Sequence, residues 1–198
     1  MIWDKVSGVY DGFETMLNGK VYTELGRRTA EYIDSGDIVL ECACGTGAIS
    51  EAIAKKCRRL VATDLSSKMM AQAEKKCMSY GNTIFRKADM TAINCRDERF
   101  DKVVAGNVIH LLDEPQKAVS EMLRVCKKGG KVIIPTYINR SEKTSKFLVK
   151  TCEDVGIRFK HEFTLDSYME FFRDMGLTDV EFFVIDGTMP CAVAVISR

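Results

Sequence analysis

The chain has 198 residues, a length typical of one domain and long enough to bury a core without a disulfide or a structural metal. Hydrophobic residues make up 46% of it and charged residues 29%, which excludes a disordered, collagen-like or coiled-coil protein. The 29 basic and 28 acidic residues nearly cancel, so no strong field would attract nucleic acid or an anionic membrane.

Short apolar runs alternate with helical patterns from residue 38 onward. Residues 38–40 are the first predicted strand, followed by a glycine turn and a helical pattern. Residues 60–62 are the second strand, which ends at Asp64, and a serine at position 66 or 67 can cap the next helix.

The second half continues the alternation. Pro115 suits the first turn of a helix that Gly129 and Gly130 would end. Asp166 would cap a helix that stops at Gly176. The remaining strands are predicted at 83–87, 102–105, 131–134, 180–185 and 192–196, and further helices at 142–155 and 166–175.

Five strand–helix units and a terminal hairpin predict a doubly wound, Rossmann-like α/β fold. The sheet would have seven mostly parallel strands with an antiparallel terminal hairpin, and helices on both faces. We expect one domain over residues 1–198, with a helical cap at 1–36 and an α/β core at 37–198. Such sheets bind ligands at the carboxyl ends of their strands.

The eight cysteines are too few for a disulfide scaffold, and none is spaced as a CxxC pair. Most stand where a small apolar residue would fit, so we expect buried thiols in a reducing compartment and no metal site. The sequence shows no apolar leader segment and no apolar run long enough for a membrane span. These features predict a cytoplasmic protein.

The strongest motif lies at residues 39–47, where Glu41 precedes a loop containing Gly45 and Gly47. The glycines allow a sharp turn and a close approach of the backbone to a ligand. Asp64, at the end of the second strand, could hold both hydroxyls of a ribose or could cap the following helix. A dinucleotide fingerprint would need a third glycine where Ser50 stands, and the chain has little room for a second substrate domain.

These residues resemble the motifs of class I S-adenosylmethionine-dependent methyltransferases, most closely the small-molecule subgroup of ubiquinone and menaquinone biosynthesis. Residues 41–47 resemble the first motif, with Ala43 in place of its first glycine, and residues 63–66 resemble the second. Residues 88–90, 100–110 and 123–131 resemble the segments around strands three to five, and residues 6–11 resemble the N-terminal segment that closes over the cofactor.

The resemblance implies S-adenosylmethionine as cofactor. It would place Asp64 on the ribose, Asp89 on the adenine amino group and Asn107 at the methionine end. Asp89 could instead be a turn cap, and Tyr10 a surface tyrosine. The implied cofactor-binding residues are Tyr10, Glu41, Ala43, Gly45, Gly47, Asp64, Leu65, Met69, Asp89, Met90 and Asn107.

The implied reaction is in-line displacement of a methyl group, which releases S-adenosylhomocysteine. The leaving thioether is neutral and needs no acid, and a base matters only for an acceptor that carries a proton. His110 and Tyr137 are the catalytic candidates for contacting the acceptor. His110 could be a general base, a hydrogen-bond donor to substrate or a packed structural imidazole.

Near-neutral charge and the lack of an added recognition domain favour a small-molecule acceptor, with no nucleic acid as partner. Aromatic and apolar residues of the cap, Trp3 and Tyr22 among them, could line the acceptor site or form the core of the cap itself. The alternatives are a protein that binds S-adenosylmethionine without turnover and a methyltransferase that acts on RNA or protein. The chain could be a monomer or a homodimer.

Overall fold

The computed structural model describes residues 3–4, 7–8, 10–139 and 158–198, with side chains omitted for residues 10–17. The helix predicted at 142–155 therefore lies outside the described residues.

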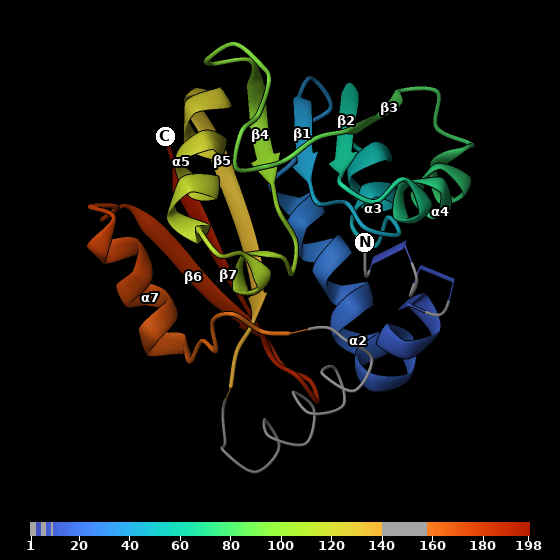
Figure 1. Ribbon diagram of the computed structural model, residues 1–198. Coiled ribbons are helices and arrows are strands. Elements are labelled where there is room, and N and C mark those ends of the chain that lie inside the picture. Colours follow the sequence, from blue (N-terminus) through green and yellow to red (C-terminus); the bar gives the residue numbers. More distant parts are fainter. Residues whose placement is uncertain (1–2, 5–6, 9, 140–157) are drawn as a thin grey trace.

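A seven-stranded sheet with the order β3-β2-β1-β4-β5-β7-β6 forms the centre of the molecule (Figure 1). The first five strands of the chain pair in parallel, whereas β7 runs antiparallel to both β5 and β6. This confirms the predicted fold class. The strands are β1 (Ile38–Cys42), β2 (Arg59–Asp64), β3 (Thr83–Lys87), β4 (Phe100–Val104), β5 (Cys126–Tyr137), β6 (Val180–Ile185) and β7 (Cys191–Ser197).

Helices cover both faces because adjacent strand residues point to opposite sides. Val103 and Val104 of β4 illustrate this, since they belong to different core clusters. One cluster joins the sheet to α5 (Pro115–Val125) and α7 (Leu165–Asp174). The other joins the sheet to α2 (Tyr10–Glu31), α3 (Ser50–Ala54) and α4 (Ser67–Cys77).

The N-terminal helix α2 is bent and anchored to the far end of the chain. Asn18 has non-helical dihedral angles, and its side-chain nitrogen donates to the carbonyl of Met189 at 2.7 Å. At Gly187 a Cβ atom would overlap Val21, so a glycine there allows α2 to lie against the turn between β6 and β7. The first segment of the chain is thereby held beside the last two strands.

Two predicted boundaries are wrong. Helix α5 ends at Val125, and β5 already starts at Cys126, so Gly129 and Gly130 lie within a strand. Gly130 is required there because a Cβ atom would stand 2.6 Å from the carbonyl oxygen of Asp101 in the neighbouring strand. The helix predicted to start with Asp166 as cap is instead capped by Thr164, whose hydroxyl accepts from the backbone of Ser167.

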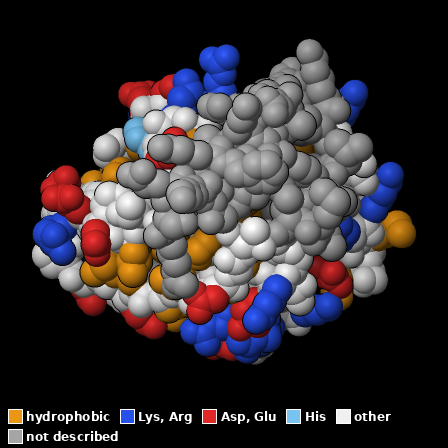
Figure 2. All heavy atoms as spheres, turned by 90° about the horizontal axis from the view of Figure 1, so that it is seen from below, with side chains coloured by type: hydrophobic (Ala, Val, Ile, Leu, Met, Phe, Trp, Pro, Cys, Tyr) orange, Lys and Arg blue, Asp and Glu red, His pale blue; other side chains and the backbone are white. Residues whose placement is uncertain are grey.

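Acidic and basic side chains are interspersed over the described part of the face in Figure 2. Within the described residues, no helix combines the length and the apolar character that a bilayer crossing requires.

Candidate functional site

The loop after β1 is built from residues with left-handed backbone angles. The φ angles are 50° at Ala43, 55° at Gly45 and 86° at Gly47. A Cβ atom on Gly47 would lie 2.9 Å from Cα of Ala73, so this glycine allows the loop to pack on α4. A Cβ atom on Gly45 would meet no other atom within 4 Å, so this glycine borders open space. The two glycines therefore have different roles, and the short helix α3 begins only at Ser50.

Asp64 at the end of β2 ties two loops together. Its Oδ2 accepts from the backbone N–H of Gly45 at 2.9 Å, and its Oδ1 accepts from that of Ser66 at 2.7 Å. Burial raises the pKa of this carboxyl, although backbone hydrogen bonds work in the opposite direction. A carboxylate oxygen can accept more than one hydrogen bond, so these contacts leave capacity for a ligand.

Glu41 is a buried carboxyl at the end of β1. Only 2% of the residue is exposed, and its Oε2 accepts from the Ser50 hydroxyl at 2.6 Å. Burial raises its pKa to about 8, opposed by the Ser50 hydrogen bond, and the nearby Asp64 carboxylate adds to the rise. Such a group has a strong tendency to accept either a proton or a cationic ligand.

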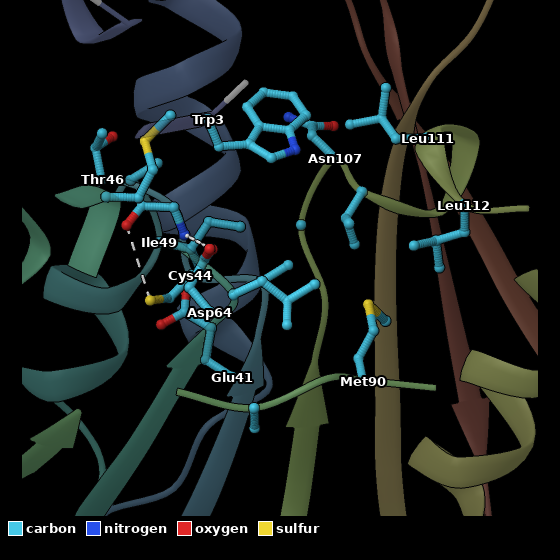
Figure 3. A pocket seen from close by; sticks show the side chains of 18 of the residues that line it. Trp3, Glu41, Cys44, Thr46, Ile49, Asp64, Met90, Asn107, Leu111 and Leu112 are labelled. Carbon is cyan, nitrogen blue, oxygen red and sulfur yellow. Dashed lines mark hydrogen bonds between the residues drawn. The ribbon is translucent and has the colours of Figure 1, made fainter. Parts of the chain in front are cut away.

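These side chains line a cavity of about 410 Å³, a volume within the range of small-molecule sites (Figure 3). It opens at the carboxyl ends of β1, β2 and β4, as expected for a doubly wound sheet. Nine of the predicted cofactor residues line it: Glu41, Ala43, Gly45, Asp64, Leu65, Met69, Asp89, Met90 and Asn107. Gly47 packs against Ala73 and is absent from the lining, and the side chain of Tyr10 lies outside the described part of the chain.

The residues after β3 and β4 show how polar atoms are positioned at the cavity. Asp89 caps a turn through Oδ1, which accepts from both the N–H and the hydroxyl of Thr91 at 2.8 Å. Asn107 has a φ of 51°, and its N–H donates to the carbonyl of Pro135 at 2.9 Å. Both side chains nevertheless line the cavity, so the turn cap and the site role are compatible at Asp89.

Sequence reasoning assigned no cofactor role to several lining residues. Ile49, Leu111 and Leu112 supply apolar walls, Thr46 lies between the two loop glycines, and Trp3 comes from the start of the chain (Figure 3). Leu111 and Leu112 directly follow the motif segment at 100–110, so their position in the sequence could have identified them as lining residues. Trp3 and Tyr22 both line the cavity, and their aromatic character was the signal that made them candidates for the acceptor site.

The two catalytic candidates lie together but outside the lining of this cavity. His110, in a 3₁₀ turn at Ile109–Leu111, is 3% exposed, and its Nδ1 lies 3.0 Å from the hydroxyl of Thr136. Its ring packs against Tyr137 and Phe159, with ring centres 5.9 and 4.7 Å away. Burial lowers the pKa of His110 to about 3, and it is therefore neutral at physiological pH.

The described lining contains three carboxyl groups, those of Glu41, Asp64 and Asp89, and no lysine or arginine. A pyrophosphate would be repelled there, whereas a cation would be attracted. In the described ranges, no three His, Cys, Asp or Glu side chains are grouped so that they could hold a metal ion. The carboxyl groups of the lining suit a small organic cation.

Residues 40–134 match the family model described as "Methyltransferase domain". The chain carries a class I S-adenosylmethionine-dependent methyltransferase domain. The match extends from β1 to β5 and includes most of the residues that line the cavity.

Curated proteins named as methyltransferases match part of the chain. The methyltransferase is 36% identical over 128 residues to "Phosphatidylethanolamine N-methyltransferase" of Cereibacter sphaeroides, over 63% of each chain. It is 31% identical over 136 residues to "Demethylmenaquinone methyltransferase" of Clavibacter sepedonicus, over 67% of this chain and 55% of that protein. The chain thus matches about three-fifths of the length of these relatives.

Solved structures extend the likeness of the fold to the whole chain. A "SAM-dependent methyltransferase, possible histamine N-methyltransferase" of Thermotoga maritima has a TM-score of 0.74, with 18% identity over 100% of this chain and 98% of that one. At this identity the match supports the fold alone. S-adenosylmethionine is the cofactor of the methyltransferase class, and its net positive charge fits the acidic lining.

Proposed function

We propose that this methyltransferase transfers a methyl group from S-adenosylmethionine to a small-molecule acceptor by in-line displacement and releases S-adenosylhomocysteine. The observation that carries the proposal is the cavity at the ends of β1 and β2. It is acidic and borders a loop glycine that leaves space for a ligand. A sulfonium ligand that bears an ammonium group matches this charge, and a phosphate-bearing dinucleotide does not.

Each polar group has a place in this proposal. Asp64 accepts hydrogen bonds from the ribose hydroxyls while it holds Gly45 and Ser66. Asp89 uses Oδ2 for the adenine amino group, because Oδ1 already holds Thr91. Leu65, Met69 and Met90 enclose the adenine ring, and Glu41, Ala43, Gly45 and Asn107 serve the remaining parts of the cofactor. Gly47 supports the loop by packing on α4, and Tyr10 is proposed as a contact only because of the motif resemblance.

The cofactor supplies an electrophilic methyl group whose leaving group is a neutral thioether. The protein therefore has to orient the donor, exclude water and hold the acceptor in line. His110, in the turn after β4, and Tyr137, the last residue of β5, lie side by side and are proposed to contact a part of the acceptor that extends beyond the described cavity lining. A neutral His110 can accept or donate a hydrogen bond, and it can act as a base only for an acceptor of low pKa.

The acceptor is proposed to be a small, partly apolar molecule. Ile49, Leu111 and Leu112 give the cavity an apolar wall. The relatives named for phosphatidylethanolamine and demethylmenaquinone support an acceptor of lipid-like character. We further propose a cytoplasmic enzyme of one domain, monomeric or homodimeric, most of whose cysteines serve as small buried side chains.

Calorimetry with S-adenosylmethionine, S-adenosylhomocysteine and NAD⁺ tests the cofactor. Binding of the first two without the third is the expected result, and failure of both sulfur ligands to bind overturns the proposal. A screen with methyl-labelled S-adenosylmethionine against amines, quinols, thiols and phospholipids then tests the acceptor. Labelling of RNA or protein alone, or binding with no label transferred to any acceptor, would favour the two alternative functions.

A further inference from the structure

The N-terminal segment adds an aromatic side chain to the cofactor cavity. Trp3 lines the cavity although it precedes β1 by 35 residues in the chain (38 − 3). Figure 3 draws its indole at the same end of the cavity as Asn107, with Met90 at the opposite end. Trp3 is the single tryptophan of the protein.

The neighbour of Trp3 fastens this segment to the cofactor site. The Ser66 hydroxyl donates to Oδ1 of Asp4 at 2.6 Å. Ser66 is fully buried, and its backbone N–H donates to Oδ1 of Asp64 at 2.7 Å. Its hydroxyl oxygen also caps α4 by accepting from the N–H of Met69. A chain of hydrogen bonds thus runs from Asp64 through Ser66 to Asp4, next to Trp3.

The strand order indicates which part of the cofactor Trp3 would meet. Asp89 and Met90 follow β3, Asp64 ends β2, and Asn107 follows β4 on the other side of β1. With adenine beyond β3 and ribose beyond β2, the rest of the molecule extends across β1 toward β4. Trp3 stands at that end, where the sulfonium and its methyl group would lie.

We propose that Trp3 packs its indole face against the sulfonium end of the bound cofactor, and that Asp4 holds Trp3 there through Ser66. The inference rests on the proposed function, since it requires S-adenosylmethionine in this cavity. An aromatic face attracts a positive charge, whereas the thioether of the product is neutral. Trp3 therefore favours the methyl donor over the spent product, and Asp4 and Ser66 are positioning residues.

Emission from the single tryptophan tests the positioning role without any ligand. We expect Asp4→Ala to shift the Trp3 emission to longer wavelength and to increase its quenching by acrylamide. Asp4→Asn retains an oxygen that can accept from Ser66 and should stay close to wild type. Asp174→Ala, which removes an exposed acid at the end of α7, is the matched control. Emission and quenching in Asp4→Ala equal to the control would overturn the role of Asp4.

The preference for the charged ligand tests the contact itself. Calorimetry should show that Trp3→Ala weakens binding of S-adenosylmethionine about three- to tenfold more than binding of S-adenosylhomocysteine. Trp3→Phe, which keeps an aromatic face, should retain most of the difference. Equal losses for both ligands mean a purely structural tryptophan and overturn the contact. A wild-type protein that binds neither ligand overturns the proposed function and this contact, while the emission of Asp4→Ala still decides the role of Asp4.

Discussion

The loops that follow β1 and β2 differ from the part of the sheet formed by β5, β7 and β6. The loops contain unfavourable backbone angles beside a buried carboxyl, whereas the three strands belong to a well-packed apolar region. At the loop end, Ala43, Gly45 and Gly47 take left-handed backbone angles, and Glu41 is a carboxyl buried without a cationic partner among its hydrogen bonds. In β7, which lies between β5 and β6, residues 191–196 are all buried, and aromatic rings of α7 pack against the sheet.

This difference separates the residues proposed to bind the ligand from the residues that contribute most to folding stability. Left-handed angles and a buried carboxyl without a cationic partner each cost free energy and persist only when the surroundings hold them in place. The packing of α7 on the sheet is a source of stability, since Tyr168 and Phe172 are fully buried with ring centres 5.0 Å apart. We therefore expect mutations in the β5, β7 and α7 region to lower the free energy of unfolding. Mutations in the loop after β1 should change ligand affinity or raise the free energy of unfolding.

The largest effect should come from the stable region. Phe172→Ala removes a fully buried ring that packs on Tyr168 and Phe171, and should lower the free energy of unfolding by about 3–5 kcal/mol. Urea unfolding measures this loss, and Phe172→Leu should lose less. The folded fraction should still bind S-adenosylhomocysteine with wild-type affinity. A loss of affinity in the folded fraction would contradict the division between the two regions.

From the raised pKa of the buried Glu41 we expect the free energy of unfolding to depend on pH. Because its pKa is about 8 in the folded protein and about 4.5 when unfolded, the folded state binds the extra proton between these values. Its contribution to stability is therefore complete below pH 4.5 and is lost as the pH rises toward 8. Glu41→Gln should stabilise the ligand-free protein by about 2–3 kcal/mol at pH 7. Parallel stability curves for both proteins between pH 5 and 8 would refute this.

Asp64→Ala should weaken binding of S-adenosylhomocysteine by about 1.5–3 kcal/mol, because charged hydrogen bonds to the ribose would be lost. Calorimetry on the folded variant measures the change. Asp97→Ala removes an acid paired with Arg124, away from the described cavity lining, and should leave the affinity unchanged. Unchanged affinity in Asp64→Ala would remove Asp64 from the binding site.

The smallest effect concerns the backbone at Ala43. Its φ of 50° disfavours any side chain, so Ala43→Gly should raise the free energy of unfolding by about 0.5–1 kcal/mol after the added flexibility of the unfolded chain is counted. Thermal unfolding followed by circular dichroism provides the measurement. Ala118→Gly, within α5, should lower stability by about 1 kcal/mol. A loss of stability in both variants would show that Ala43 is not strained.

Local patterns predicted most elements and failed where a neighbour in space decides. The alternation of apolar strands and amphipathic helices was sufficient to predict the succession of β1 to β7 along the chain. It misplaced the end of α5, because Gly130 is required by the carbonyl of Asp101 in an adjacent strand. Gly45 and Gly47 looked equivalent in the motif, yet the first borders open space and the second packs on α4.

The sequence by itself determined the fold class, the strand ends that carry the site and the nine predicted residues that line the cavity. The fold class and the strand ends follow from periodicity, and the nine residues follow from the resemblance of their motifs to those of the methyltransferase family. Only the tertiary structure decided that His110 is buried against Thr136 and neutral, that Glu41 has a raised pKa, and that Trp3 reaches the cavity. The reason is that burial and charge environment depend on contacts between segments distant in the chain, which no local pattern records.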